Sequence, residues 1–174
     1  MPTFEQLLTA NRQYVDAGRH RPLPVEPARQ LVVLSCMDSR IDAFAALGLD
    51  LGDAHVLRTA GARVTDDMLR SLTLSTHILG TRTVVVLGHT RCGLLDPEGT
   101  LLTRLADAMG RTPTQREWGE FTDPATAVRD DCQRLLSWPD RPEGFRVAGG
   151  VFDVDSGIIN AVIELTAADA KSPA

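Results

Sequence analysis

The sequence has few aromatic residues, no long apolar run and no excess of positive charge. Among its 174 residues, aromatic side chains make up 5%, and 18 lysines and arginines stand against 23 aspartates and glutamates. Because no basic field would gather phosphate groups, we do not expect nucleic acid as a partner. The longest apolar runs, such as 84–87, are too short to cross a membrane, and the N-terminus lacks the pattern of a signal peptide. We therefore expect a cytoplasmic protein with no membrane association.

Cysteine is also scarce, which argues against a framework of disulfide bonds. The chain has three cysteines, and in a reducing compartment they are expected to be thiols or metal ligands. Cys132 shares a predicted helix face with Val128 and Leu135, so we interpret it as a small core residue. Cys36 and Cys92 remain as candidate ligands.

Residues 1–30 are predicted to form an N-terminal helical arm. Thr3 and Gln6 have the spacing of a capping box, and apolar residues then follow helical periodicity. Three prolines at 22, 24 and 27 prevent a regular helix and favour an extended segment that can lie on a partner subunit. At the other end, residues 166–174 are small and polar without periodicity, and we expect a disordered tail.

Between these ends, residues 31–165 show the pattern of an α/β fold. The β-rich runs 31–36, 55–59 and 83–88 alternate with segments of helical character, which is typical of a parallel sheet with crossover helices. Two further apolar runs near the C-terminus are joined by the turn-forming residues 155–157 and predict a hairpin. We expect a single domain with a central, mostly parallel sheet flanked by helices, and an antiparallel edge near the C-terminus.

Three helices can be placed by their caps. Thr65 is the predicted N-cap of a helix that Gly80 ends. Asp96-Pro97 and Asp123-Pro124 each combine an N-cap with proline at the first helical position, and their helices are expected to run toward residues 110 and 138. The residues between these two helices are predicted to be a loop.

Residues that can carry chemistry gather in two short strings, each placed where an apolar run stops. The first contains Cys36, Asp38 and Arg40, whose alternation puts all three on one face of an extended chain. The second contains His89 and Cys92, which a turn into a helix would bring together. Both strings lie at carboxyl ends of predicted parallel strands, where open α/β sheets place their ligands.

Cys36, His89 and Cys92 form the donor set of a catalytic zinc site. Zinc prefers thiolate and imidazole, whereas magnesium and calcium need oxygen ligands and iron–sulfur clusters normally need more cysteines. A structural zinc site closes with four protein ligands, but a catalytic site supplies three and leaves a position for water. We therefore expect a Zn²⁺ cofactor.

Asp38 is the expected acceptor for a hydrogen bond from zinc-bound water, and Arg40 would keep its carboxylate ionised and oriented. Three other interpretations stay open. Asp38 could bind zinc directly and close the site, which would make the protein a non-catalytic zinc-binding regulatory module. The Asp38–Arg40 pair could also be an ordinary surface ion pair, and each cysteine alone a small core residue.

The pattern Cys-x-Asp-x-Arg, followed later by His-x-x-Cys, resembles the motif pair of the β-class carbonic anhydrases. Four other stretches resemble consecutive segments of that family; these stretches are 52–61, 64–79, 87–95 and 151–154. The similarity therefore extends from residue 31 to residue 165. The chain departs from the family at Thr59, where asparagine is common, and at Arg91, where small or acidic residues are frequent.

This resemblance implies reversible hydration of carbon dioxide to bicarbonate and a proton by a zinc-bound hydroxide. It also implies that Cys36, His89 and Cys92 hold the metal and that Asp38 and Arg40 form the catalytic pair. The N-terminal helix would embrace the other subunit of a homodimer, and dimers could pair into a tetramer. Relatives of the same fold act on carbonyl sulfide or carbon disulfide, so hydrolysis of those molecules is the alternative.

Two other enzyme classes are disfavoured. A phosphatase loop of the form Cys-x5-Arg fails because Glu98 stands where arginine would follow Cys92, and Arg40 follows Cys36 too closely. A phosphate-binding loop is unsupported because the chain has no Gly-x4-Gly-Lys-Ser/Thr motif.

Overall fold

A computed structural model describes residues 1–115 and 117–167 of the chain, and its centre is one five-stranded sheet. The strand order is β2-β1-β3-β4-β5, with parallel pairing throughout except between β4 and β5. The strands are β1 Leu31–Cys36, β2 Ala54–Thr59, β3 Thr83–His89, β4 Arg146–Phe152 and β5 Ile159–Ala167. This confirms the α/β fold class, with its mostly parallel sheet and its antiparallel C-terminal edge.

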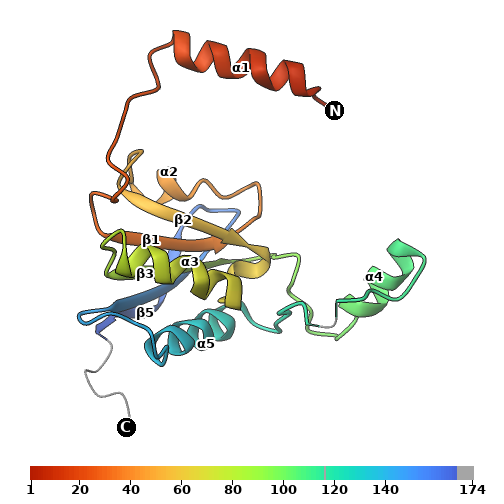
Figure 1. Ribbon diagram of the computed structural model, residues 1–174. Helices are drawn as coiled ribbons and strands as arrows, with labels where there is room; N and C mark the ends of the chain where they lie inside the picture. Colours follow the sequence, from red (N-terminus) through yellow and green to blue (C-terminus); the bar gives the residue numbers. More distant parts are fainter. Residues whose placement is uncertain (116, 168–174) are drawn as a thin grey trace.

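The helices lie on and around this sheet. They are α1 Phe4–Asp16, α2 Ala43–Leu47, α3 Asp66–His77, α4 Leu101–Met109 and α5 Pro124–Leu136, with a short 3-10 helix η1 at Ala60–Ala62. Helices α3 and α5 lie on the same side of the sheet, whereas α1 stands apart from it (Figure 1). Helix α4 projects beyond the carboxyl ends of β1 and β2 (Figure 1). Among the described helices, none is long and apolar enough to cross a membrane.

Helix α5 packs closely on β3 and β4 because glycines leave room for it. A Cβ atom at Gly88 would lie 2.7 Å from Val128, and one at Gly149 would lie 2.6 Å from the same side chain. Cys132, one turn further along α5, is fully buried and its thiol donates a hydrogen bond to the Ala148 carbonyl at 3.6 Å. The interpretation of Cys132 as a core residue is confirmed.

The cap predictions are confirmed at α1, α3 and α5. Thr3 and Gln6 exchange both hydrogen bonds of a capping box, and the Thr65 and Asp123 side chains each accept from a backbone N–H of the first turn. Pro124 occupies the first turn of α5, as expected. Helix α3 ends at His77, a little before the predicted glycine.

The predicted start of the next helix at Asp96-Pro97 is wrong. Gly99 adopts a left-handed conformation, with φ 67°, so the chain cannot continue as a helix through it, and α4 begins only at Leu101. Asp96 still serves the helix, because its carboxylate accepts from the backbone N–H groups of Thr100 and Leu101 at 3.0 and 2.9 Å. Asp96 therefore caps a helix that begins later in the sequence than predicted.

The two ends of the chain differ in how they are anchored. Helix α1 has no buried residue, and the extended segment after it joins the sheet where Ala28 and Arg29 donate to the carbonyls of Gly52 and Asp53. At the C-terminus, β5 continues to Ala167, so residues 166 and 167 belong to a strand rather than to the expected tail. Residues 168–174 lie outside the described part of the chain.

Candidate metal centre

Cys36 and His89 are the last residues of neighbouring parallel strands. Strands β1 and β3 pair in register from Leu31 with Thr83 to Ser35 with Leu87, so their carboxyl ends meet at one edge of the sheet. Cys36 is 4% exposed and His89 is 1% exposed. The central position of both strands explains this burial, because each has a neighbour on both sides.

Cys92 reaches the same place through a tight turn after β3. Arg91 adopts a left-handed conformation with φ 52°, which reverses the chain between His89 and Cys92. The ligand atoms of Cys36, His89 and Cys92 all lie within 4.8 Å of one another, and the two sulfurs are 4.0 Å apart. Two thiolates on one tetrahedral zinc ion would be about 3.8 Å apart, so the spacing fits that ion.

The imidazole of His89 is oriented as a metal ligand. Its Nδ1 lies 2.9 Å from the carbonyl oxygen of Thr90, and donation of a proton there leaves a lone pair on Nε2. Nε2 is buried and has no hydrogen-bond partner among the described residues. Its distance of 3.8 Å to Asp38 Oδ2 is too long for a hydrogen bond. An unpartnered buried acceptor beside two thiols is an observation that a zinc ion would explain.

The two sulfurs are held and polarised by their surroundings. The contact with the Cys92 sulfur lowers the pKa of Cys36, burial raises it, and the nearby imidazole of His89 and the backbone N–H groups of Asp38 and Gly61 lower it further. The contact with the Cys36 sulfur and burial both raise the pKa of Cys92. The backbone N–H of Leu94 also points to the Cys92 sulfur at 3.5 Å.

Asp38 and Arg40 form a two-pronged ion pair beside the cluster. Arg40 Nε donates to Asp38 Oδ1 at 2.9 Å and Nη2 donates to Oδ2 at 2.6 Å. This contact holds the pKa of Asp38 well below its usual range. Arg40 also donates to the Arg91 carbonyl at 3.0 Å, so the pair is tied to the loop that carries Cys92. Asp38 itself is not a member of the ligand cluster within the described residues.

Arg58 is a site residue to which the sequence analysis assigned no role. From the end of β2, its guanidinium donates to the carbonyl oxygens of Cys36 at 2.8 Å and Asp38 at 2.5 Å. These bonds hold the backbone of the first string in place. Arg58 lies in the 52–61 segment that resembles the family, but no motif in its neighbouring residues predicts its contact with the Cys36 and Asp38 carbonyls.

A cavity of about 680 Å³ lies against the ligand cluster, and we call it the metal-facing cavity. Much of its wall is apolar and comes from segments remote from the two strings. Leu101 and Leu105 are contributed by α4, and Trp118 by the segment before α5. The remaining lining residues are Cys36, Met37, Asp38, Ser39, Arg40, Ala60, Gly61, Cys92, Gly93 and Leu94. The arrangement can therefore present a metal ion to a small apolar molecule.

The chain is similar to known proteins along most of its length. A family model described as carbonic anhydrase matches residues 31–133. Beta-carbonic anhydrase 1 of Mycobacterium tuberculosis is 36% identical over 165 residues, which cover 93% of this chain and 99% of that protein. A carbon disulfide hydrolase of an Acidianus species is 41% identical over 152 residues, or 74% of each chain.

The crystal structure of a carbonic anhydrase from Streptococcus mutans extends this likeness to the fold. It superposes with a TM-score of 0.84 at 40% identity and covers 93% of this chain and 98% of its own. Cluster, fold and sequence agree, and the chain belongs to the β-class carbonic anhydrase family.

Proposed function

We propose that this protein is a zinc-dependent carbonic anhydrase that reversibly hydrates carbon dioxide to bicarbonate and a proton. The observation that carries the proposal is the buried Cys36, His89 and Cys92 cluster, which supplies three ligands and opens on an apolar cavity. When bound there, zinc supplies a Lewis acid and a water molecule of lowered pKa. The two thiolates and one neutral imidazole would balance the charge of the ion.

Asp38 accepts a hydrogen bond from the O–H of the nucleophile and so orients it. Because Arg40 binds both carboxylate oxygens and lowers the pKa of Asp38, this acceptor stays ionised at neutral pH. The Arg40 bond to the Arg91 carbonyl keeps the acceptor in place relative to the loop that carries Cys92. Fixed acceptors of this kind act without reorganising during the reaction.

The metal-facing cavity binds the substrate. Leu94, Leu101, Leu105 and Trp118 offer apolar surface, which suits a small neutral molecule. Bicarbonate, being charged, would leave this apolar surface for water.

Stopped-flow measurement of carbon dioxide hydration, with zinc measured in the same preparation, tests the proposal. We expect about one zinc ion per chain and a hydration rate that disappears when zinc is removed and returns when it is restored. A zinc-loaded protein without any rate at every pH would contradict the proposal. That outcome would favour the non-catalytic module, in which Asp38 closes the site.

Hydrolysis of carbon disulfide or carbonyl sulfide is the second candidate. Relatives named carbon disulfide hydrolase match this chain, including one from Acidithiobacillus thiooxidans that is 41% identical over 92% of it. The apolar wall of the metal-facing cavity would also suit a linear sulfur compound. Parallel assays of carbon dioxide, carbonyl sulfide and carbon disulfide on one preparation discriminate the two activities.

We further propose that the protein acts as a homodimer. Helix α1 exposes Phe4, Leu7, Leu8 and Val15 and stands apart from the sheet, so its apolar face has no partner within the described chain (Figure 1). A second copy would cover that face. Light scattering on the purified protein should give the mass of a dimer or a multiple of it, and deletion of residues 1–18 should give monomers.

The free thiols of all three cysteines support a reducing, cytoplasmic location.

A further inference from the structure

The segment that carries Asp38 is held in place more by hydrogen bonds than by packing. Residues 37–40, which we call the Asp38 segment, lie between the buried Cys36 and Ile41, and all four are exposed or partly buried. Met37 contributes the apolar side chain of the segment and is 69% exposed. Because burial fixes little of this segment, its position depends on the hydrogen bonds that reach it from neighbouring elements.

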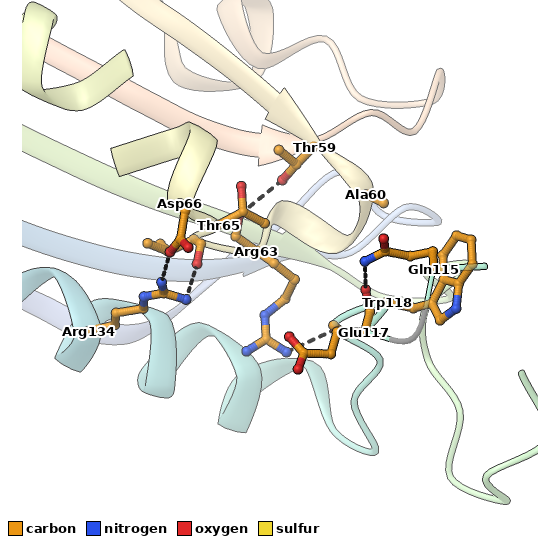
Figure 2. A pocket seen from close by; sticks show the side chains of 11 residues that line it. Thr59, Ala60, Arg63, Thr65, Asp66, Gln115, Glu117, Trp118 and Arg134 are labelled. Atoms are coloured by element: carbon orange, nitrogen blue, oxygen red, sulfur yellow. Dashed lines mark hydrogen bonds and ion pairs between the residues drawn. The ribbon is translucent and has the colours of Figure 1, made fainter. Parts of the chain in front are cut away.

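Strand β2 is the neighbour of this segment, but the regular ladder between them ends early. The pairing of β1 with β2 runs to Cys36 with Thr59, and the Met37 N–H still donates to the Thr59 carbonyl at 2.8 Å. Beyond Thr59 the chain turns into η1, where the Thr59 hydroxyl donates to the Arg63 carbonyl at 3.1 Å (Figure 2). The backbone of β2 therefore stops running alongside β1 just where the Asp38 segment begins.

The side chain of Arg58 makes the contact that the ladder no longer makes. Its Nε donates to the Cys36 carbonyl at 2.8 Å and its Nη2 donates to the Asp38 carbonyl at 2.5 Å. We call these two bonds the Arg58 clamp. A planar guanidinium presents its donors in a rigid fork, so one side chain fixes two peptide groups at once.

Asp38 also makes local hydrogen bonds. Its carboxylate accepts from the backbone N–H of Arg40 at 3.0 Å and from the Arg40 guanidinium, and its carbonyl accepts from the Ile41 N–H at 3.2 Å. Contacts between residues this close in sequence orient the carboxylate within its own segment but do not place the segment on the sheet. Arg40 adds a link to the Arg91 carbonyl, and Arg58 adds the link to β2.

We propose that Arg58 is a positioning residue, which holds the Asp38 segment against β2 so that the Asp38 carboxylate keeps its place beside the ligand cluster. The expected effect on the reaction rests on the proposed function, whereas the Arg58 clamp is a property of the chain without metal. The inference gives a role in the reaction to β2, which contributes no member of the ligand cluster among the described residues.

Amide hydrogen exchange of the purified protein tests the Arg58 clamp without reference to activity. Arg58→Met removes both bonds and keeps an apolar side chain of similar length. We expect faster exchange of the Met37 and Arg40 amides, because loss of the clamp frees the segment to open. Unchanged exchange of residues 37–40 in the folded variant would overturn the inference.

Arg82→Met is the matched control for the exchange measurement. Arg82 also donates to two backbone carbonyls, those of Thr76 and Thr81, at 2.7 and 2.8 Å. It directly precedes the amino end of β3, whereas the metal ligand His89 lies at the carboxyl end of that strand. Exchange of residues 37–40 should stay at the wild-type rate in this variant. Equal acceleration in both variants would reflect a general loss of stability and would overturn the inference.

Hydration rates of the zinc-loaded protein test whether Arg58 acts through Asp38. Arg58→Met should lower the rate by roughly 10–100-fold, the usual effect of losing a group that supports a metal site, while zinc content stays the same. In an Asp38→Ala background the same change should leave the rate nearly unchanged, because no carboxylate remains to be positioned. A wild-type rate in Arg58→Met, loss of its zinc, or full multiplication of the two single losses would overturn the inference.

Arg58→Lys separates the geometry of the side chain from its charge. Lysine keeps the positive charge but offers a single nitrogen in place of the fork, so we expect this variant also to exchange faster and react more slowly than the wild type. If Arg58→Met does not fold, Arg58→Lys takes its place in both measurements. Wild-type exchange and rate in Arg58→Lys would overturn the inference. Failure of the wild type to bind zinc or hydrate carbon dioxide would instead overturn the proposed function.

Discussion

The ligand cluster and the wall of the cavity in front of it are built by different parts of the molecule. Cys36 and His89 end two central strands, and each is at most 4% exposed. The wall comes from α4, which has one buried residue, Leu101, and from the segment that carries Trp118. The comparison teaches that the sheet positions the metal ligands, whereas peripheral segments supply the apolar wall in front of them.

If the ends of β1 and β3 and the turn after β3 together hold the metal, removing one of the two thiols has the largest effect. Loss of a side chain that only hydrogen-bonds to a metal ligand lowers metal affinity by up to roughly 100-fold. Because Cys92→Ala removes a ligand itself, we expect a larger loss of zinc affinity and the disappearance of hydration activity. Cys132→Ala is the matched control, because that cysteine lies on the buried face of α5, away from the ligand cluster. Zinc analysis after dialysis checks both variants. Equal zinc loss in the two would show that the effect is one of folding.

The next largest effect is expected at Asp38, which acts on the nucleophile without holding the metal. Asp38→Asn should lower the hydration rate by about 10²–10⁴-fold while zinc content stays the same. Asp42→Asn serves as control, because Asp42 caps α2 through the Ala45 N–H. Loss of zinc from Asp38→Asn would instead identify the carboxylate as a metal ligand, which the cluster geometry argues against.

The pH dependence of the hydration rate tests whether two thiolates and one neutral imidazole bind the metal. Two thiolates neutralise the metal more than three histidines do, so the bound water is acidified less, and the rate should rise between about pH 7 and pH 9. Asp38 adds no step in this range, because Arg40 holds its pKa well below the usual value. A rate that falls steadily above neutrality would contradict this account.

The smallest effect is expected where α4 is anchored. Hydrogen bonds from the backbone N–H groups of Leu101 and Thr100 lower the pKa of Asp96, so its stabilising effect is present above the ordinary carboxyl pKa. That stability is lost as the pH falls through the lowered pKa. Asp96→Asn should therefore reduce the thermal midpoint at pH 7 and narrow the difference between pH 7 and pH 3. If the thermal midpoint of Asp96→Asn depended on pH as that of the wild type does, the Asp96 carboxylate would not stabilise the fold.

The ligand edge could be predicted from sequence because its causes are local. Apolar runs place β1 and β3, parallel pairing brings their carboxyl ends together, and the short spacing from His89 to Cys92 needs only one turn. The caps of α1, α3 and α5 were predictable for the same reason, since each depends on residues within one turn.

The wall of the metal-facing cavity could not be predicted, because its causes are tertiary. The start of α4 depends on the left-handed Gly99 and on the reach of the Asp96 carboxylate. Trp118 reaches the wall of this cavity on a segment that is anchored where the Phe121 backbone pairs with Leu94 and Asp96. Arg58 likewise binds carbonyls on a neighbouring strand, a contact that no local pattern encodes.

X-ray absorption at the zinc edge tests most directly whether the ends of β1 and β3 hold one metal ion. The account predicts two sulfur neighbours at about 2.3 Å and nitrogen or oxygen neighbours at about 2.0–2.1 Å, completing four-coordinate zinc. The first shell of Cys132→Ala should be identical. A spectrum with one sulfur or none, or one altered by Cys132→Ala, would contradict the assignment of Cys36 and Cys92 as the ligand pair.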